Sequence, residues 1–315
     1  MTRLTVGLLA RHTPKGPTGR GAALIDIAQD LLLNRLAEVG MFKHLVFKGG
    51  TALRKLYAGS SGRFSTDLDF SVLRAEDDVA SVTELLTDAI DGLIIDEFSY
   101  SIHLRRGRPI VAYETPFGGA GGLSTKLDIG PPPWLPVARR GWVRLPVHAA
   151  YSTPATLPVM SLVENMAEKV ARLNRVSPAR DVYDLDWVGR TTPHSTFDES
   201  LLRRTAVLKC WVDLHGLHTP TARWLQIPGA RPFDPQRWLQ VRAAGEFDDE
   251  NIGVLASPSP DLDALARALS SRYAFLADLD SEERQWAQGR PEDRNQVIAA
   301  IKGLPGGRLA AASLY

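Results

Sequence analysis

Hydrophobic positions recur with two different periods along the chain, and each period predicts its own kind of element. Between residues 65 and 72 apolar and polar side chains alternate, which is the period of a half-buried strand. Residues 22–39 carry apolar side chains at every third or fourth position, which predicts an amphipathic helix with Asp26 and Asp30 on its solvent side. We therefore expect the first half of the chain to mix strands and helices.

The same patterns predict the remaining elements. Apolar runs bounded by turn residues indicate strands over 44–47, 94–111 and 123–129. Helical patterns and start signals indicate helices over 51–57, 77–93, 161–175, 178–189, 198–215, 234–243, 260–280 and 291–302. We expect an α+β fold, with a mixed sheet and flanking helices in residues 1–155 and a mainly helical domain in residues 156–315.

Composition is that of an ordinary globular protein. Of the 315 residues, 44% are hydrophobic and 23% are charged, and no apolar run approaches the roughly 18 residues of a membrane span. Cys210 is the only cysteine, which excludes an internal disulfide and suits a reducing compartment. We expect a cytoplasmic protein that makes no membrane contact.

Charge is unevenly distributed, although the net charge is only +1. Residues 101–150 carry a net charge of +5, whereas residues 241–300 carry −6. A basic stretch is a candidate footprint for a polyanion, because neutralising phosphates supplies much of the affinity for nucleic acid. The alternative is that these arginines only balance the acidic stretch. The candidate RNA contacts are Arg105, Arg106, Arg108, Arg139 and Arg140.

Two aspartates and a glycine turn carry the candidate chemistry. Asp67 and Asp69 emerge from one face of the predicted strand, roughly 7 Å apart at the backbone. Like charges this close favour a shared cation, and Mg2+ prefers oxygen ligands. Gly49-Gly50 opens the predicted helix 51–57, whose free N–H groups can receive phosphate oxygens. The alternatives are a solvated strand face and an ordinary turn. The compact order of strand, Gly-Gly-Thr turn, helix and Asp-x-Asp strand favours a nucleotide site.

A third carboxylate commonly completes a metal site for nucleotidyl transfer. Asp128 is the best candidate, because alternation in the strand 123–129 turns Leu127 and Ile129 inward and leaves Asp128 beside Lys126 on the other face. The alternative is a surface Lys–Asp pair on an edge strand, in which case Asp128 would be dispensable.

Two helices of the second half hold further candidates. Ser161 and Glu164 form a capping-box pattern at the start of the first. Lys169 falls at the edge of its apolar stripe, where it can reach a triphosphate or simply extend to solvent. Asp181, in the first turn of the next helix, can stabilise the helix dipole, accept a proton from an acceptor hydroxyl or orient Lys169. We favour orientation of Lys169.

Five segments together resemble a known family. They are Phe47–Leu53, Arg63–Phe70, Lys126–Ile129, Glu164–Lys169 and Arg180–Leu185, and they resemble the AbiEii/AbiGii nucleotidyltransferase toxins, including the MenT toxins, of the DNA polymerase β-type superfamily. The resemblance covers residues 20–215 and implies a polymerase-β-like fold. It also implies a toxin that blocks translation by transferring NMP from an NTP to an RNA acceptor, the tRNA 3′ end, and that has a cognate antitoxin.

The resemblance also assigns roles within the candidate site. Mg2+ would be held by Asp67, Asp69 and Asp128, and the triphosphate by Lys48, Gly49, Gly50, Thr51 and Lys169. The helical domain would contribute Lys169 and Asp181 to the cleft.

Three other functions stay open at the level of sequence. A glycosyltransferase would use Asp-x-Asp to hold a nucleotide-sugar, but it gives no account of the Gly-Gly-Thr turn. A nucleotidyltransferase acting on a small molecule such as an antibiotic, or on a protein, would be insensitive to RNA. A catalytically silent binding protein would keep its effect on growth after Asp69→Ala.

Overall fold

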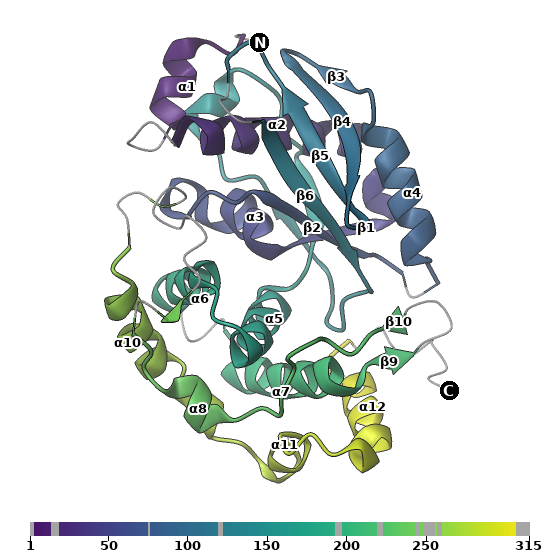
Figure 1. The fold of residues 1–315 in the computed structure, drawn as a ribbon, viewed down its shortest axis with the longest axis vertical. Coiled ribbons are helices and arrows are strands. Elements are labelled where there is room, and N and C mark those ends of the chain that lie inside the picture. The colour runs from purple at the N-terminus through teal and green to yellow at the C-terminus, as the bar shows by residue number, and fades with distance from the viewer. Residues whose placement is uncertain are drawn as a thin grey trace. The chain divides into compact units, whose positions relative to one another are not determined.

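The structure is a computed structural model that describes residues 3–13, 19–74, 76–118, 122–192, 197–218, 223–243, 246–247, 256 and 260–306. The chain divides into two compact units. The sheet unit comprises residues 1–132, 137–159 and 253–259. The helical unit comprises residues 133–136, 160–252 and 260–315 (Figure 1). No helix in the described ranges is both long and apolar enough to cross a membrane.

An eight-stranded mixed sheet forms the sheet unit. Its strands are β1 (Leu45–Lys48), β2 (Asp67–Val72), β3 (Ile94–Ile95), β4 (Phe98–Arg105), β5 (Arg108–Glu114), β6 (Leu123–Gly130), β7 (Ala138–Gly141) and β8 (Thr156–Val159). They lie in the order β3-β4-β5-β6-β2-β1-β8-β7. β2 pairs in parallel with β6, and β1 in parallel with β8, while the other neighbours are antiparallel.

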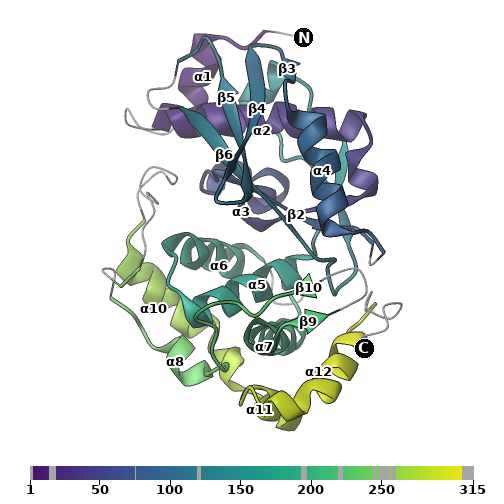
Figure 2. The ribbon, with the colours of Figure 1, turned by 45° about the vertical axis from the view of Figure 1, so that its right-hand side comes forward.

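Within the described residues, the α-helices that accompany the sheet are α1 (Val6–His12), α2 (Gly19–Glu38), α3 (Gly49–Leu53) and α4 (Val79–Ile90). α3 continues directly into a π-helix at Arg54–Ala58. α2 runs across β4, β5 and β6 (Figures 1 and 2). Its buried side chains share one hydrophobic core with α4 and with the apolar face of β2. The opposite face of β2 therefore carries the polar side chains.

The helical unit is built from α5 (Leu162–Arg175), α6 (Ala179–Thr191), α7 (Glu199–His215), α8 (Pro235–Leu239), α10 (Leu262–Arg272), α11 (Ser281–Trp286) and α12 (Arg294–Lys302), with a short ribbon of β9 (Leu217–His218) and β10 (Arg223–Trp224). α5 packs against α7, and α6 packs against α10. The predicted α+β class, with a mixed sheet followed by a mainly helical part, is confirmed.

Several predicted boundaries were wrong. The single helix predicted over 260–280 ends at Arg272, and α11 starts afresh because Asp280 and Glu283 form a capping box. The helix predicted over 234–243 ends at Leu239. β7 and β8 were not predicted, since β7 is an edge strand with little apolar alternation.

Candidate active site

The pairing of three strands brings the sequence-predicted acids together on one face of the sheet. β2 and β6 pair with Asp69 opposite Asp128 and with Asp67 opposite Lys126. Residues paired in register point to the same face, and neighbouring strands lie about 4.8 Å apart. β1 pairs with β2 so that Lys48 is opposite Asp69. Lys48, Asp69 and Asp128 therefore form one row across three strands, with Asp67 in the next row.

The side chains of this row do not converge as a ready metal site. Among the residues that the structure describes, no three His, Cys, Asp or Glu side chains lie in position to share an ion. Asp128 is exposed and its Oδ2 lies 3.5 Å from Lys126 Nζ. The donor set nevertheless suits a hard divalent cation, because three carboxylates stand on adjacent positions of one face.

The turn after β1 depends on glycine at Gly49. Its φ is +77°, which favours a residue without a side chain. A Cβ at this position would lie 2.2 Å from Asp69 Oδ2, so any side chain would collide with the carboxylate. The helical stretch that begins here is joined to β2 because the Thr51 hydroxyl donates to the backbone carbonyl of Asp67. The turn therefore packs directly against the part of β2 that carries Asp67 and Asp69.

Lys48 also lies on the face of the acids. Its Nζ is 3.5 Å from the point where a Cβ on Gly130 would stand. Gly130 follows Asp128 by two positions on β6 and is paired with Ser71 of β2. The lysine therefore places a cation beside the row of carboxylates, where a triphosphate would need one.

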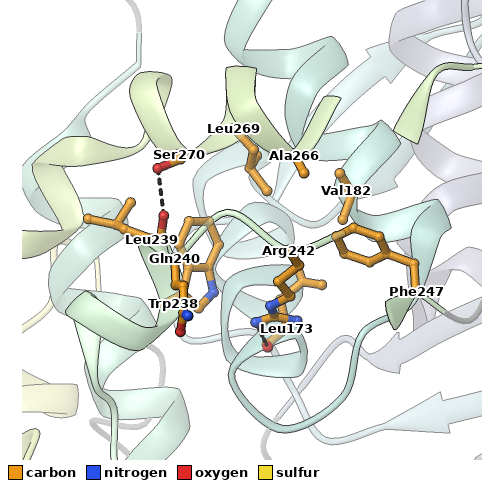
Figure 3. Close-up of a pocket in the computed structure, with 10 residues that line it drawn as sticks. All are labelled: Leu173, Val182, Trp238, Leu239, Gln240, Arg242, Phe247, Ala266, Leu269 and Ser270. Carbon is orange, nitrogen blue, oxygen red and sulfur yellow. Dashed lines mark hydrogen bonds between the residues drawn. The ribbon is translucent and has the colours of Figure 1, made fainter. Parts of the chain in front are cut away.

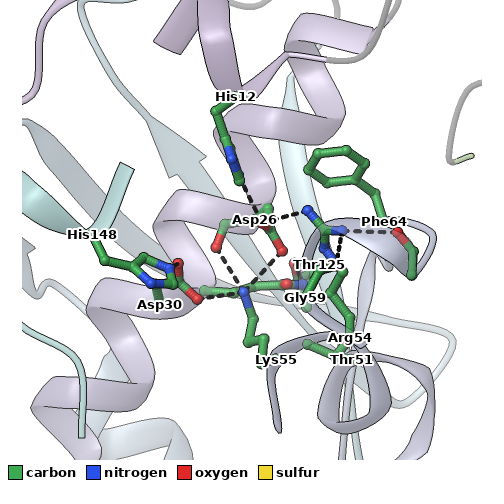
Figure 4. Close-up of polar contacts among 12 residues, drawn as sticks. His12, Asp26, Asp30, Thr51, Arg54, Lys55, Gly59, Phe64, Thr125 and His148 are labelled. Atoms are coloured by element: carbon green, nitrogen blue, oxygen red, sulfur yellow. Dashed lines mark hydrogen bonds and ion pairs between the residues drawn. The ribbon is translucent and has the colours of Figure 1, made fainter. Parts of the chain in front are cut away.

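A second charged cluster lies entirely inside the sheet unit, and the sequence pattern missed it. Lys55, in the π-helix, donates from Nζ to Asp26 Oδ1 at 2.9 Å and to Asp30 Oδ1 (Figure 4). Arg54 donates to the carbonyl of Gly62 at 2.8 Å and lies 3.7 Å from Asp26 Oδ2. The prediction that Asp26 and Asp30 face solvent was wrong, since they are 2% and 1% exposed.

Burial on nearly every side of α2 explains this error. Apolar residues such as Leu24, Ile27 and Leu31 surround the two aspartates in sequence, so the helix has no wholly polar face in this stretch. That continuous apolar composition was the signal that could have identified the buried pair.

Two histidines and a tyrosine complete this cluster. His12 Nε2 lies 2.8 Å from Asp26 Oδ2, and His148 Nε2 lies 3.1 Å from Asp30 Oδ2. The Tyr151 hydroxyl donates to Asp30 Oδ2 at 2.7 Å. Burial alone would raise the pKa of both aspartates, but the surrounding cations outweigh it. The pKa of Asp26 lies well below its usual value and that of Asp30 is lowered, chiefly through Lys55.

The helical unit holds the other predicted site residues. Lys169 Nζ, on α5, lies 3.0 Å from Asp181 Oδ1 and 2.8 Å from Asp184 Oδ2, both on α6. Arg172 Nε lies 2.8 Å from Asp181 Oδ2. Lys169 does not extend to solvent, because its side chain is only 8% exposed. Asp184, at the i+3 position from Asp181, is the partner whose role the sequence reasoning did not assign.

Glu164 does not act as the predicted reciprocal cap. Ser161 does accept from the Glu164 N–H at 3.1 Å, but the Glu164 carboxylate accepts from the N–H groups of Trp134 and Leu135, both at 2.8 Å. Lys209 Nζ lies 2.8 Å from the same carboxylate. The acid therefore anchors the segment between β6 and β7, and it is fully buried and satisfied there.

The five arginines predicted to contact RNA do not form one patch. Arg105, Arg106 and Arg108 lie at the β4–β5 hairpin, near one edge of the sheet. Arg139 and Arg140 lie on β7, the opposite edge strand. β4 and β7 are six places apart in the strand order, roughly 29 Å at about 4.8 Å for each step. Arg140 in addition stacks on Tyr57, 4.3 Å from the ring centre.

A mixed sheet whose neighbouring strands carry acids beside a glycine turn that opens a helix is typical of nucleotidyltransferases. The family model described as nucleotidyl transferase AbiEii toxin, of type IV toxin–antitoxin systems, matches residues 31–268. The chain belongs to this family of nucleotidyltransferase toxins, which confirms the resemblance seen in the sequence. Membership implies an NTP substrate and an antitoxin, and nucleotidyltransferases of this kind are typically metal-dependent.

Among solved structures, the chain is similar to MenT4, a nucleotidyltransferase toxin from Mycobacterium tuberculosis H37Rv. The identity is 36% and the TM-score 0.83, over 96% of this chain and 99% of that one. A weaker likeness is to the Cid1 poly(U) polymerase, with 15% identity and a TM-score of 0.23 over 84% of this chain and 70% of that one. Another is to CdnC of E. coli MS115-1, with 13% identity and a TM-score of 0.25 over 90% of this chain and 95% of that one. No curated protein matches the chain.

Proposed function

We propose that the chain transfers a nucleoside monophosphate from an NTP to an RNA acceptor, the 3′ end of tRNA, and so blocks translation. The observation that carries the proposal is the row of Lys48, Asp69 and Asp128 across three paired strands, beside a turn that only glycine fits. Membership of a toxin family supports an antagonist of growth that an antitoxin controls.

The residues of the row suit a divalent cation and a triphosphate. Asp67, Asp69 and Asp128 would hold Mg2+, which when bound neutralises charge on the α-phosphate and on the departing pyrophosphate. Lys48 and the backbone N–H groups of Gly50 and Thr51 would bind the triphosphate oxygens, because the start of a helix carries partial positive charge. Gly49 permits the close approach of backbone and carboxylate.

The transfer forms one bond and breaks one. The acceptor hydroxyl oxygen bonds to the α-phosphorus, the bond from that phosphorus to the β-phosphate oxygen breaks, and pyrophosphate leaves. The hydroxyl proton passes to Asp128, the exposed carboxylate of the three. Lys169 would neutralise phosphate charge, and Asp181 would orient it through the 3.0 Å ion pair.

Incubation of the purified chain with Mg2+, each labelled NTP in turn and total tRNA tests the proposal. Label is expected on RNA, with one NTP preferred. Asp69→Asn should lower the rate by at least about 100-fold, since it removes a charged ligand from the centre of the row. Asp88→Asn is the matched control, because Asp88 is exposed on α4, away from the row.

Each other outcome decides against a specific part of the proposal. Label on protein or on a small molecule, unaffected by added RNA, would overturn the RNA acceptor. Absence of transfer to any acceptor, together with growth arrest that persists in Asp69→Asn, would overturn the enzyme itself.

A further inference from the structure

A polar cavity lies at the C-terminal end of α5, within the helical unit. Its volume is about 220 Å3, and residues 173–177, 231, 237, 240–242 and 246 line it. Four of its lining residues are arginines: Arg175, Arg231, Arg237 and Arg242. The sequence did not single them out, because they are spread over 68 positions and the last of them falls in an acidic stretch. A space of this size holds several water molecules or one phosphate group, as a water takes about 30 Å3.

The arginines are held in place by backbone and side-chain contacts. Arg242 donates from Nη1 to Ser177 Oγ at 2.6 Å and from Nη2 to the carbonyl of Leu173 at 3.0 Å. Arg231 donates to the carbonyl of Arg175 at 3.2 Å. Arg175 in turn pairs with Asp213. Two of the four guanidinium groups are therefore fixed on the last turn of α5 and a third is fixed on α7.

The described lining of the cavity carries more positive than negative charge. Four arginines face two nearby acids among the described residues, Asp213 and Glu246. The pKa of Arg242 is lowered by burial first, and Arg237 and Arg231 lower it further while Glu246 opposes them. The positive charges therefore repel one another, and a bound anion would reduce that repulsion.

Capping of the α5 terminus explains only part of this arrangement. Cations at a helix C-terminus satisfy free carbonyls and favour the dipole, which accounts for Arg231 and Arg242. It does not account for Arg237, which lies exposed on α8 and whose guanidinium has no acidic partner among the described residues. Because Arg237 is exposed and lines the cavity, a ligand can reach it.

The neighbouring apolar pocket is not an alternative ligand site. It is lined by Trp238, Phe247 and Leu269, and it shares Arg242 with the arginine cavity (Figure 3). Figure 3 shows the Arg242 guanidinium turned toward the Leu173 carbonyl. The volume of the pocket, about 20 Å3, admits no more than a water molecule or two. A base or an apolar side chain does not fit there.

We propose that the arginine cavity binds a backbone phosphate of the RNA acceptor. Guanidinium groups match the geometry of phosphate oxygens, and none of the described lining residues is aromatic and able to stack a base, so recognition would be independent of sequence. A magnesium–NTP complex fits less well, because among the described lining residues Glu246 is the one carboxylate, with no second acid beside it to hold the cation. This inference rests on the proposed RNA acceptor and assigns a contact to it.

Binding of a fluorescent RNA hairpin with a single-stranded 3′ end, measured by anisotropy on the full-length chain, tests the cavity. Arg237→Gln should weaken RNA binding about three- to tenfold and reduce the slope of log affinity against log salt by roughly 0.7–0.9. Arg231→Gln/Arg237→Gln should weaken it further, whereas Arg237→Lys should retain most of the affinity. Arg284→Gln, an exposed arginine on α11, is the matched control and should stay within twofold.

The outcomes separate this inference from the proposed function. If the unmodified chain transfers label to RNA but Arg237→Gln and the double variant bind RNA as it does, the cavity proposal is overturned and the proposed function stands. If NTP affinity falls in Arg237→Gln as far as RNA affinity does, the cavity binds nucleotide, and the proposal is again overturned. If the unmodified chain neither binds nor labels RNA, the proposed function itself fails.

Discussion

Two lysines in this protein are each held between two aspartates, one in each unit. Lys55 contacts Asp26 and Asp30 in the sheet unit, and Lys169 contacts Asp181 and Asp184 in the helical unit. Both lysine side chains are buried, at 2% and 8% exposure. Burial and ion pairing therefore do not distinguish a structural lysine from a candidate active-site lysine.

The two clusters differ in what they connect. The Lys55 cluster joins α1, α2, the π-helix and residues 148–151, segments that are far apart in sequence. The ion pairs that Lys169 and Arg172 form within the described residues run between α5 and α6, which are consecutive, and Arg172 is 36% exposed. A cluster that joins many segments fixes the fold, whereas a local cluster with an exposed cation is compatible with the active-site role that we propose for Lys169.

The position of Lys55 gives its cluster a further consequence. Lys55 follows Thr51 by four residues in the same helical stretch, which begins at Gly49 beside Asp69. Anchoring Lys55 on α2 thus anchors the backbone that would receive the triphosphate. π-helical turns are rare and frequently mark functional sites, which agrees with this position.

Loss of Lys55 is the largest effect that we expect. Lys55→Met should lower the free energy of unfolding by about 3–5 kcal/mol, because it leaves two buried carboxylates without their shared cation. Denaturant unfolding followed by circular dichroism measures it. Lys43→Met, at an exposed lysine, should change the stability by less than about 0.5 kcal/mol. A loss below about 1 kcal/mol in Lys55→Met would show that the cluster does not hold the fold.

Loss of Lys169 should affect stability less and activity more. Lys169→Met should cost about 1–3 kcal/mol, since Arg172 continues to pair with Asp181. Nucleotide transfer should fall by about 100-fold or more with the protein still folded, because the proposed role of Lys169 is to neutralise phosphate charge. The measurement is the rate per folded molecule in the labelled-NTP assay. A fall no greater than the fall in the folded fraction would make Lys169 structural, like Lys55.

The sequence predicted the elements of the site well, but it predicted charge burial poorly. The alternation over residues 65–72 and 123–129 correctly predicted β2 and β6, because one face of each strand packs on the core. The same rule failed for α2: a polar residue every fourth position indicates a solvent face, yet Asp26 and Asp30 are neutralised inside. Periodicity records polarity and carries no information on a partner elsewhere in the chain.

Partners distant in sequence account for the other failures. The roles of Lys55 and of the cavity arginines could not be predicted from the sequence, because their contacts lie on other elements. The pairing of Asp69 with Asp128 is likewise a property of strand order, which alternation alone does not determine. Strand β7 escaped prediction for a different reason, as an exposed edge strand need not carry an apolar face.

The smallest effect that we expect is on the pH dependence of the free energy of unfolding, through Asp30 of the Lys55 cluster. Asp30 is surrounded by Lys55, His148 and Tyr151, and Asp26 lies nearby. Burial alone would raise the pKa of Asp30, but the pKa is lowered in the folded state. Its stabilising contribution is therefore present above the unfolded pKa of about 3.9 and is lost as the pH falls through the lower folded value. Asp30→Asn should make the stability curve below about pH 4 shallower by up to about 1.4 kcal/mol per pH unit, one proton. Chemical denaturation at a series of pH values measures the slopes, and parallel curves for the variant and the unmodified chain would remove Asp30 from the acid response.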